Sequence, residues 1–226
     1  MDFLAGVKRL RQECGVPGVG PITVVDQTGE MRRLVDWYAQ ALIEIQLEEI
    51  YWNFLRKSLS FDTVAEQNTY EVDTDVGLSD FATYRDGSFR IYLKSGTRGD
   101  EIFLTQYNYD NFRDIYLYGT QLTSYSRPTT IAHTPDDSLV LGLPPDDVYT
   151  VIGEYYRTPV EVTLDDDVPV LPARFHMLIV YSAMMSYGMF EAAGEVYQRG
   201  EINYKRLMNR MRMAEGPNIS TGASLI

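Results

Sequence analysis

Residues 33–56 read RLVDWYAQALIEIQLEEIYWNFLR, a helical pattern with apolar side chains on two sides. At about 100° per residue, one narrow apolar stripe comprises Leu34, Tyr38, Ala41, Ile45 and Trp52, with Trp37 and Leu55 on its edge. A second stripe lies roughly opposite and comprises Ile43, Leu47, Ile50 and Phe54. A helix on the surface of a monomer needs only one such stripe. This helix is therefore either central in a bundle or shared with a neighbouring subunit, and periodicity alone leaves both open.

Helical periodicity also appears on both sides of this stretch, towards the two ends of the chain. The helix that contains the stretch is expected to begin near Thr28, a good N-cap, and to run to about Lys57. Before it, apolar residues recur at helical spacing at Phe3, Leu4, Val7 and Leu10. After the stiff lead-in VPVLP at 168–172, helices are predicted at about Ala173–Glu191 and Glu195–Met213. The apolar or small face of the first of these comprises Phe175, Leu178, Ile179, Ser182, Met185 and Met189.

The middle of the chain has the short alternating runs and turn residues that are typical of β-strands. Strands are predicted near Leu59–Val64, Thr69–Val72, Phe81–Arg85, Phe89–Leu93, Glu101–Gln106, Thr129–His133, Ser138–Leu141 and Val148–Arg157. The pair Asp86-Gly87 is a strong signal for a tight hairpin. Residues Asn108–Leu117 are expected to form a short helix or turn.

These segments predict an α+β fold in which the terminal helices form a helical bundle with an inserted antiparallel β domain. Residues 1–57 and 168–215 would form the bundle, and residues 58–167 a small sandwich or barrel. Residues 216–226 would form a flexible C-terminal arm.

The acidic residues are concentrated in the middle of the chain. The net charge is −12 over 226 residues, and residues 58–167 hold 20 Asp/Glu against 7 Lys/Arg, a net of −13. The flanking segments nearly balance, at −1 for 1–57 and +2 for 168–226. Such a surface should repel nucleic acid, because a phosphate backbone binds neutralising cations. A single cysteine excludes an internal disulfide framework, and no run of about 18 apolar residues predicts a membrane span.

No pattern of residues predicts catalysis, a metal site or a cofactor. His133 and His176 have no metal-ligand spacing, and Cys14 stands beside Glu13, which would raise its pKa. The Gly15–Pro21 run lacks the Lys-Ser/Thr of a phosphate-binding loop. Residues 73–77 lack the further ligand positions of a calcium-binding loop. The acidic runs 136–137, 146–147 and 165–167 are expected to be solvated turns, with a weak divalent-ion site between subunits as the alternative. If the protein were an enzyme, its activity should be lost when His133 or the run 165–167 is changed.

Three segments, taken in order, resemble a known family. GEMRRLVDWYAQALIEIQ and YWNFLR resemble the first long helix of tailed-bacteriophage head-to-tail adaptor (connector) proteins. SLVLGLPPDDVYTVIGEYYRTPVEV, residues 138–162, is similar to their hairpin, Pro-Asp turn and Tyr-rich strand. LPARFHMLIVYSAMMSYGMFEAAGEVYQRGEINYKRLMNRM, residues 171–211, is similar to their closing helix pair. The resemblance covers most of the chain and is closest to the adaptors of short-tailed phages.

The resemblance implies a structural virion protein without catalytic residues, at the neck between head and tail. It implies a ring, usually a dodecamer, that docks on the portal protein and meets the tail nozzle or tail-tube proteins. DNA would pass through the ring without specific binding, and assembly would take place in the host cytoplasm. A stopper or tail-tube-end protein of the neck is the nearest alternative, and a glycan- or surface-binding virion module is the alternative of a different class.

Two groups of residues are the candidate contact sites. Ile43, Leu47, Ile50 and Phe54 are expected to face the closing helices or the next subunit. The C-terminal arm is expected to dock on the portal through Ile219, Leu225 and Ile226.

Overall fold

The computed structural model describes residues 1–216 and divides the chain into two compact units. Met1–Leu55 and the residues from Pro159 onward form the first, which we call the helical unit; Arg56–Thr158 form the second, which we call the β unit. The α+β fold with terminal helices and an inserted, mainly antiparallel β region is confirmed. Among residues 1–216, no helix combines the length and the apolar composition that crossing a bilayer requires.

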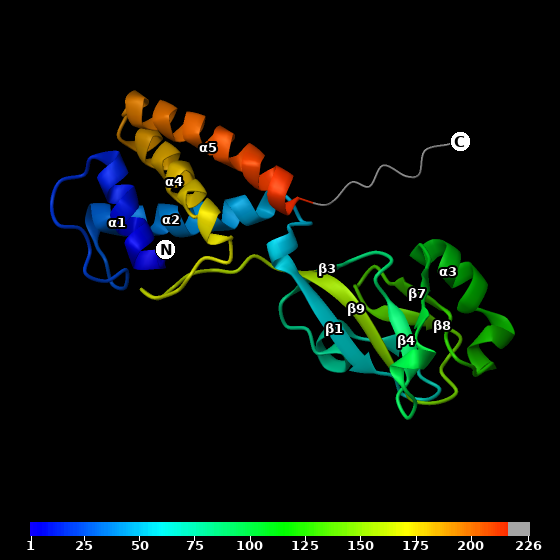
Figure 1. The fold of residues 1–226 in the computed structure, drawn as a ribbon. Helices are drawn as coiled ribbons and strands as arrows, with labels where there is room; N and C mark the ends of the chain where they lie inside the picture. The colour runs from blue at the N-terminus through cyan, green and yellow to red at the C-terminus, as the bar shows by residue number, and fades with distance from the viewer. Residues whose placement is uncertain (217–226) are drawn as a thin grey trace, which may run out of the picture. The chain divides into compact units, whose positions relative to one another are not determined.

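The helical unit is built around one central helix. Its elements are α1 (Phe3–Cys14), α2 (Gly29–Leu47), the short 3₁₀ helices η1 (Asn53–Leu55) and η5 (Ala173–Phe175), α4 (Met177–Phe190) and α5 (Gly194–Glu215). Helix α4 packs against α1, α2 and α5 (Figure 1). Its sequence MLIVYSAMMSYGMF is apolar on nearly all sides, as a helix surrounded by other helices requires. The central helix is therefore α4 and not the two-sided helix α2.

Helix α2 ends ten residues earlier than expected. It stops at Leu47, the chain turns through 48–51, and Trp52 becomes fully buried. The indole Nε1 of Trp52 donates a hydrogen bond to the carbonyl of Ile45 at 3.2 Å, and so satisfies a carbonyl that the helix end leaves unpaired. The prediction that this helix runs to about Lys57 is wrong, because Arg56 and Lys57 both lie in strand β1 (Arg56–Asp62).

The predicted face of α4 is only partly correct. Leu178, Ile179 and Ser182 are buried, but Met189 is 74% exposed. Val180, Ala183 and Met184 are buried as well, because α4 has neighbours on several sides and one helical stripe does not describe its core.

The β unit contains two sheets that share one core. The five-stranded sheet comprises β1, β9 (Tyr149–Arg157), β3 (Phe81–Tyr84), β4 (Arg90–Leu93) and β5 (Ile102–Phe103). The four-stranded sheet comprises β2 (Thr69–Tyr70), β8 (Leu139–Gly142), β7 (Thr130–His133) and β6 (Thr105–Gln106). All pairings are antiparallel except β6 with β7. The sheets form no closed barrel in the described residues. Of the two forms predicted for this region, the sandwich is therefore the correct one.

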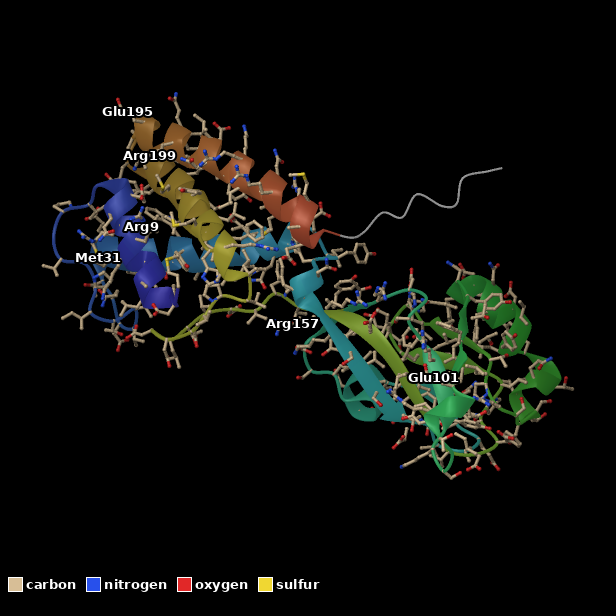
Figure 2. The ribbon with its side chains drawn as sticks, in the orientation of Figure 1. Arg9, Met31, Glu101, Arg157, Glu195 and Arg199 are labelled. Carbon is tan, nitrogen blue, oxygen red and sulfur yellow. The ribbon has the colours of Figure 1, made fainter. Side chains whose placement is uncertain are left out.

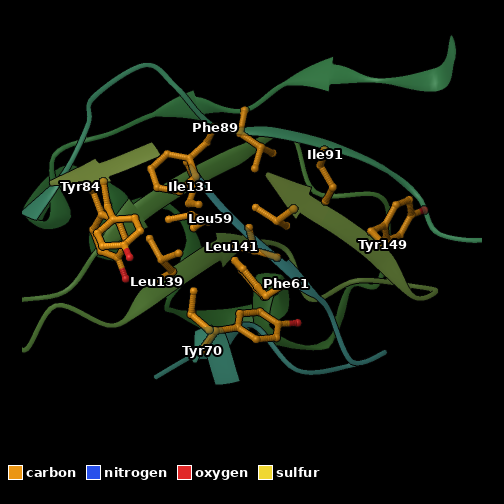
Figure 3. Close-up of a cluster of buried hydrophobic side chains, with 14 residues drawn as sticks. Leu59, Phe61, Tyr70, Tyr84, Phe89, Ile91, Ile131, Leu139, Leu141 and Tyr149 are labelled. Carbon is orange, nitrogen blue, oxygen red and sulfur yellow. The ribbon is translucent and has the colours of Figure 1, made fainter. Parts of the chain in front are cut away.

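The core of the β unit takes side chains from both sheets. Leu59 and Phe61 of β1 share one buried cluster with Ile131 and Leu141 of the second sheet (Figure 3). Val151 of β9 belongs to the same cluster. Alternate residues of each strand point inward, as a face buried on one side requires.

Helix α3 (Tyr109–Tyr116) covers the second sheet. Its Phe112 packs on Ala132 and Val140. This element confirms the short helix expected at 108–117. The other short helical segments of the unit are η2 (Val72–Val76), η3 (Arg98–Asp100) and η4 (Gly119–Thr123).

The Asp86-Gly87 hairpin is not present. Strand β3 pairs with residues 155–157 of β9, and β4 pairs with residues 149–152 on the same edge of β9. Residues 86–87 therefore join two pieces of one edge, which the nine-residue strand β9 holds in line. Phe89 fills the space beside Gly153, where an added Cβ would lie 2.7 Å from the ring.

Candidate assembly surfaces

The residues considered for catalysis or metal binding, Cys14, His133 and His176, lie in separate segments. The described residues hold no group of three or more His, Cys, Asp and Glu side chains that could bind a metal ion. Cys14 is buried, and burial raises the pKa of its thiol to about 12. His133 is exposed in the β unit. His176 is buried in the helical unit, where burial lowers its pKa and its Nε2 lies 2.8 Å from the carbonyl of Leu171.

The acidic run 165–167 holds backbone in place. The Asp165 carboxylate accepts hydrogen bonds from the Val24 amide at 2.6 Å and the Thr23 hydroxyl at 3.1 Å. The Asp167 carboxylate accepts from the amides of Leu164 and Thr163, and these bonds lower its pKa. Both carboxylates therefore fix loops of the helical unit.

The four residues expected at an interface do not form one stripe. Leu47 is 63% exposed and Ile50 is 56% exposed. Ile43 is half-buried on α2, and Phe54 is half-buried on η1, where its ring stacks on Trp52 with centroids 5.5 Å apart. Leu47 and Ile50 are thus the two that stand out from the helical unit, and we call this pair the α2-end surface.

The backbone beneath the α2-end surface is held by α5. The Glu48 carboxylate accepts from Arg212 at 2.6 Å and from the Tyr204 hydroxyl. Burial and the nearby Glu48 carboxylate both raise the pKa of Tyr204. Since Glu48 lies between Leu47 and Ile50, these contacts fix the turn from which both apolar side chains project. Met213, which follows Arg212, is 82% exposed.

The end of α5 is the last part of the chain that the structure describes. Asn53 donates a hydrogen bond to the carbonyl of Gly216 at 3.4 Å. The predicted docking residues Ile219, Leu225 and Ile226 lie outside the described residues.

Most of the cations of α5 are paired within the helical unit. Arg199, labelled in Figure 2, donates to the backbone carbonyl of Glu13 and lies 3.6 Å from its carboxylate. Lys205 pairs with Glu201 at 2.7 Å. These contacts tie α5 to α1 and to itself and leave less positive charge for a neighbour.

The loop between α1 and α2 presents two apolar side chains. Val19 is 96% exposed and Ile22 is 90% exposed. The loop is held at both ends, because Arg11 donates to the carbonyl of Val16 at 2.6 Å and Asp165 binds the Val24 amide. Apolar residues between glycine and proline in GVGPI were the signal for a displayed loop that the sequence analysis missed.

A groove of about 690 Å³ crosses the outer face of the five-stranded sheet. It is lined by Arg56, Arg85, Arg90 and Arg98, by Glu101 and Glu154, and by Ser58, Ser60, Phe103 and Ile152. We call it the arginine groove. The sequence analysis missed it because the arginines come from four separate segments and no single strand carries the pattern.

The arginine groove contains two clusters of ion-paired Arg and Glu side chains. Glu154 accepts hydrogen bonds from Arg56 and from Arg85, each at 2.6 Å. Partial burial raises the pKa of Glu154, but the hydrogen bonds from both guanidinium groups outweigh it, and the net pKa is lowered. In the second cluster, Glu101, labelled in Figure 2, accepts from Arg90 at 2.7 Å.

A family model described as SU10 adaptor protein matches residues 1–222. No curated protein matches the sequence. The family match spans both units and all three segments that carried the resemblance.

Proposed function

The chain belongs to the SU10 adaptor protein family of phage head-to-tail adaptors, and from this premise we propose that its copies form a closed ring beneath the portal. The ring is a dodecamer that docks on the portal protein of a short-tailed phage and continues into the tail nozzle or tail tube. The family match supports a structural virion protein at the neck, and a non-enzymatic role.

The α2-end surface is the observation that supports ring formation best. Leu47 and Ile50 expose apolar area on a turn that is held by ion pairs. Because the turn is already fixed, little conformational freedom is lost when a neighbour covers the two side chains. In a ring each copy meets the next head to tail, so this surface faces a different surface of the neighbour. Removing such apolar side chains from water stabilises the contact by about 25 cal/mol per Å².

The charge of the chain supports passage of DNA through the ring. The acidic turns of the β unit are exposed, and include Asp73, Asp75, Asp136, Asp137, Asp146 and Asp147. In this proposal a wall with net negative charge repels the duplex, so DNA slides past it without binding. The same repulsion between free copies disfavours their association, so we expect rings to form only on the portal.

The experiment is assembly on the purified portal ring, followed by cryo-EM. Wild-type chain is expected to add to the portal as a closed ring, whereas the double variant Leu47→Asp, Ile50→Asp should add at least ten-fold less. The matched control is Val64→Asp, which changes a side chain that is 55% exposed in the β unit. A double variant that closes rings as the wild type does would remove the α2-end surface from the proposal.

Imaging of the intact virion tests the location. A map of the neck should place the chain directly between portal and tail. A map with this chain at the far end of the tail tube, or without it, would overturn the adaptor assignment.

A further inference from the structure

The arginine groove gathers positive charge in a unit that is otherwise acidic. Residues 56–158 hold 16 Asp/Glu and 9 Lys/Arg, a net charge of −7. Four of those nine cations line the groove against two carboxylates, so the groove carries a net charge of +2. A carboxylate that approaches the β unit is therefore drawn to this face and repelled elsewhere.

The guanidinium groups are held in place before any ligand arrives. Glu154 fixes Arg56 and Arg85, while Glu101 and the Phe103 ring fix Arg90, whose Cζ lies 4.1 Å from the ring centroid. A guanidinium has five N–H donors, so each of these groups keeps donors for a second carboxylate. Holding the side chains in advance lowers the entropy that binding costs.

The two clusters have the spacing of an extended peptide. Arg90 lies opposite Ile152 in the sheet, and Glu154 lies two residues further along β9. The two residues are diagonal neighbours on adjacent antiparallel strands, about 7–8 Å apart, which is close to the 6.6–6.8 Å that separates alternate side chains of an extended peptide. Carboxylates at positions i and i+2 of such a peptide can therefore reach the two clusters together.

The floor of the groove suits the rest of such a peptide. Ser58 and Ser60 are small and leave room on the β1 side, and Ile152 and the 64% exposed Phe103 offer apolar contact. We propose that the arginine groove binds an extended segment of a partner protein that carries acidic side chains at alternate positions.

Nucleic acid fits the same groove less well. A duplex carries one charge per about 1.7 Å and needs several cations along its path. The groove offers a net charge of +2, and the acidic turns of the β unit repel a polyanion that extends past it. A short peptide with two carboxylates matches both the charge and the length.

Fluorescence anisotropy with the full chain tests the proposal. The probe is a fluorescein-labelled peptide, Gly-Ser-Asp-Val-Asp-Ser-Gly, and the reference is the same peptide with both Asp replaced by Asn. We expect the Asp peptide to bind at least ten-fold more tightly, and the double variant Arg90→Gln, Arg98→Gln to remove that difference. The control is Arg113→Gln, which changes an arginine on α3 that pairs with Asp110 and Asp114.

A second variant tests the groove without removing its ion pairs, in case the double variant Arg90→Gln, Arg98→Gln does not fold. Ser60→Glu adds a negative charge to the floor without removing an ion pair, and it should weaken binding of the Asp peptide at least ten-fold. Equal binding of the Asp and Asn peptides, or wild-type affinity in both groove variants, would overturn the proposal. A hexathymidine oligonucleotide that displaces the Asp peptide and binds more tightly would assign the groove to nucleic acid instead.

Discussion

Gln46 and Val160 exchange two hydrogen bonds in the helical unit. The side-chain Nε2 of Gln46 donates to the Val160 carbonyl at 3.0 Å, and the Val160 amide donates to Gln46 Oε1 at 2.9 Å. Gln46 is only 1% exposed, and its Nε2 also donates to the carbonyl of Leu42. A side-chain amide thus pairs with backbone as a neighbouring strand would, at the point where the chain returns from the β unit.

Replacing Gln46 should destabilise the helical unit. Gln46→Ala removes both partners of the half-buried Val160 backbone, and we expect a loss of about 1–3 kcal/mol in the free energy of unfolding. Urea unfolding followed by tryptophan fluorescence measures it, because Trp37 and Trp52 both belong to this unit. Gln40→Ala, at an exposed position of the same helix, should change stability by less than about 0.5 kcal/mol. Equal unfolding midpoints for the two variants would contradict the role of the Gln46–Val160 pair.

Helices α4 and α5 approach closely at Gly200. A Cβ there would lie 2.9 Å from the backbone carbonyl of Tyr181 and 3.2 Å from Cβ of Met184. Gly200→Ala should therefore cost about 1–3 kcal/mol through overpacking, more than the gain of up to about 1 kcal/mol in helix propensity. Gly194→Ala in the first turn of the same helix is the control, since a Cβ there meets nothing within 4 Å. If thermal unfolding showed both variants to be more stable than the wild type, α4 and α5 would have room for a Cβ at Gly200, contrary to this prediction.

The turn between α4 and α5 contains a strained residue. Ala192 has a φ of 53°, a conformation that favours glycine. Ala192→Gly should stabilise the helical unit by about 0.5–1 kcal/mol by relieving this strain, as measured by urea unfolding. Ala39→Gly, inside helix α2, is the control and should destabilise by about 0.5–1 kcal/mol instead. A loss of stability in Ala192→Gly as large as that in Ala39→Gly would refute the strain.

The Glu154 cluster should make the stability of the β unit depend on pH. The pKa of Glu154 in the folded protein lies below its ordinary value of 4.5, so its contribution is fully present above pH 4.5 and is lost as the pH falls through the folded pKa. Glu154→Gln should cost about 1 kcal/mol at pH 7, and the difference from wild type should shrink as the solution is acidified below pH 4.5.

Near-ultraviolet circular dichroism of the tyrosines during urea unfolding measures this effect. Glu66→Gln, at an exposed position in the β unit, serves as the control. A deficit in Glu154→Gln that is the same at pH 7 and at pH 3 would mean that the carboxylate charge is not what stabilises the cluster.

Cys14 should be unreactive in the folded protein. Its thiol is buried and its pKa is about 12, so almost no thiolate is present at pH 8. Ellman's reagent should modify it only when the helical unit unfolds, with a rate that urea increases. Rapid modification without denaturant would show that α1 opens readily at this end.

The sequence predicted those elements whose signals are local. Strand segments with alternating residues and flanking turns were found within about three residues of their predicted positions, and 101–106 alone was split into two strands. The short helix at 109–116 and the two closing helices were likewise found. Alternation and helical spacing are set by neighbours a few residues apart, so one sequence suffices to read them.

The errors concern long-range packing. Helical spacing continued past Leu47, but Trp52 gains more by turning back into the core and bonding the Ile45 carbonyl than by extending the helix. Asp86-Gly87 has the composition of a hairpin turn, yet β9 is long enough to pair with both flanking strands along one edge. Neither outcome can be predicted from the sequence of a few neighbouring residues.

What the sequence by itself determined is the α+β class, the order of the elements, the acidic β region and the family resemblance that the family match confirms. What only the tertiary structure decided is that α4 is the central helix, that Leu47 and Ile50 remain exposed on a fixed turn, and that four distant arginines share one groove. The physical reason is that secondary structure follows from nearby residues, whereas exposure and clustering depend on which segments, far apart in the chain, pack or pair with one another.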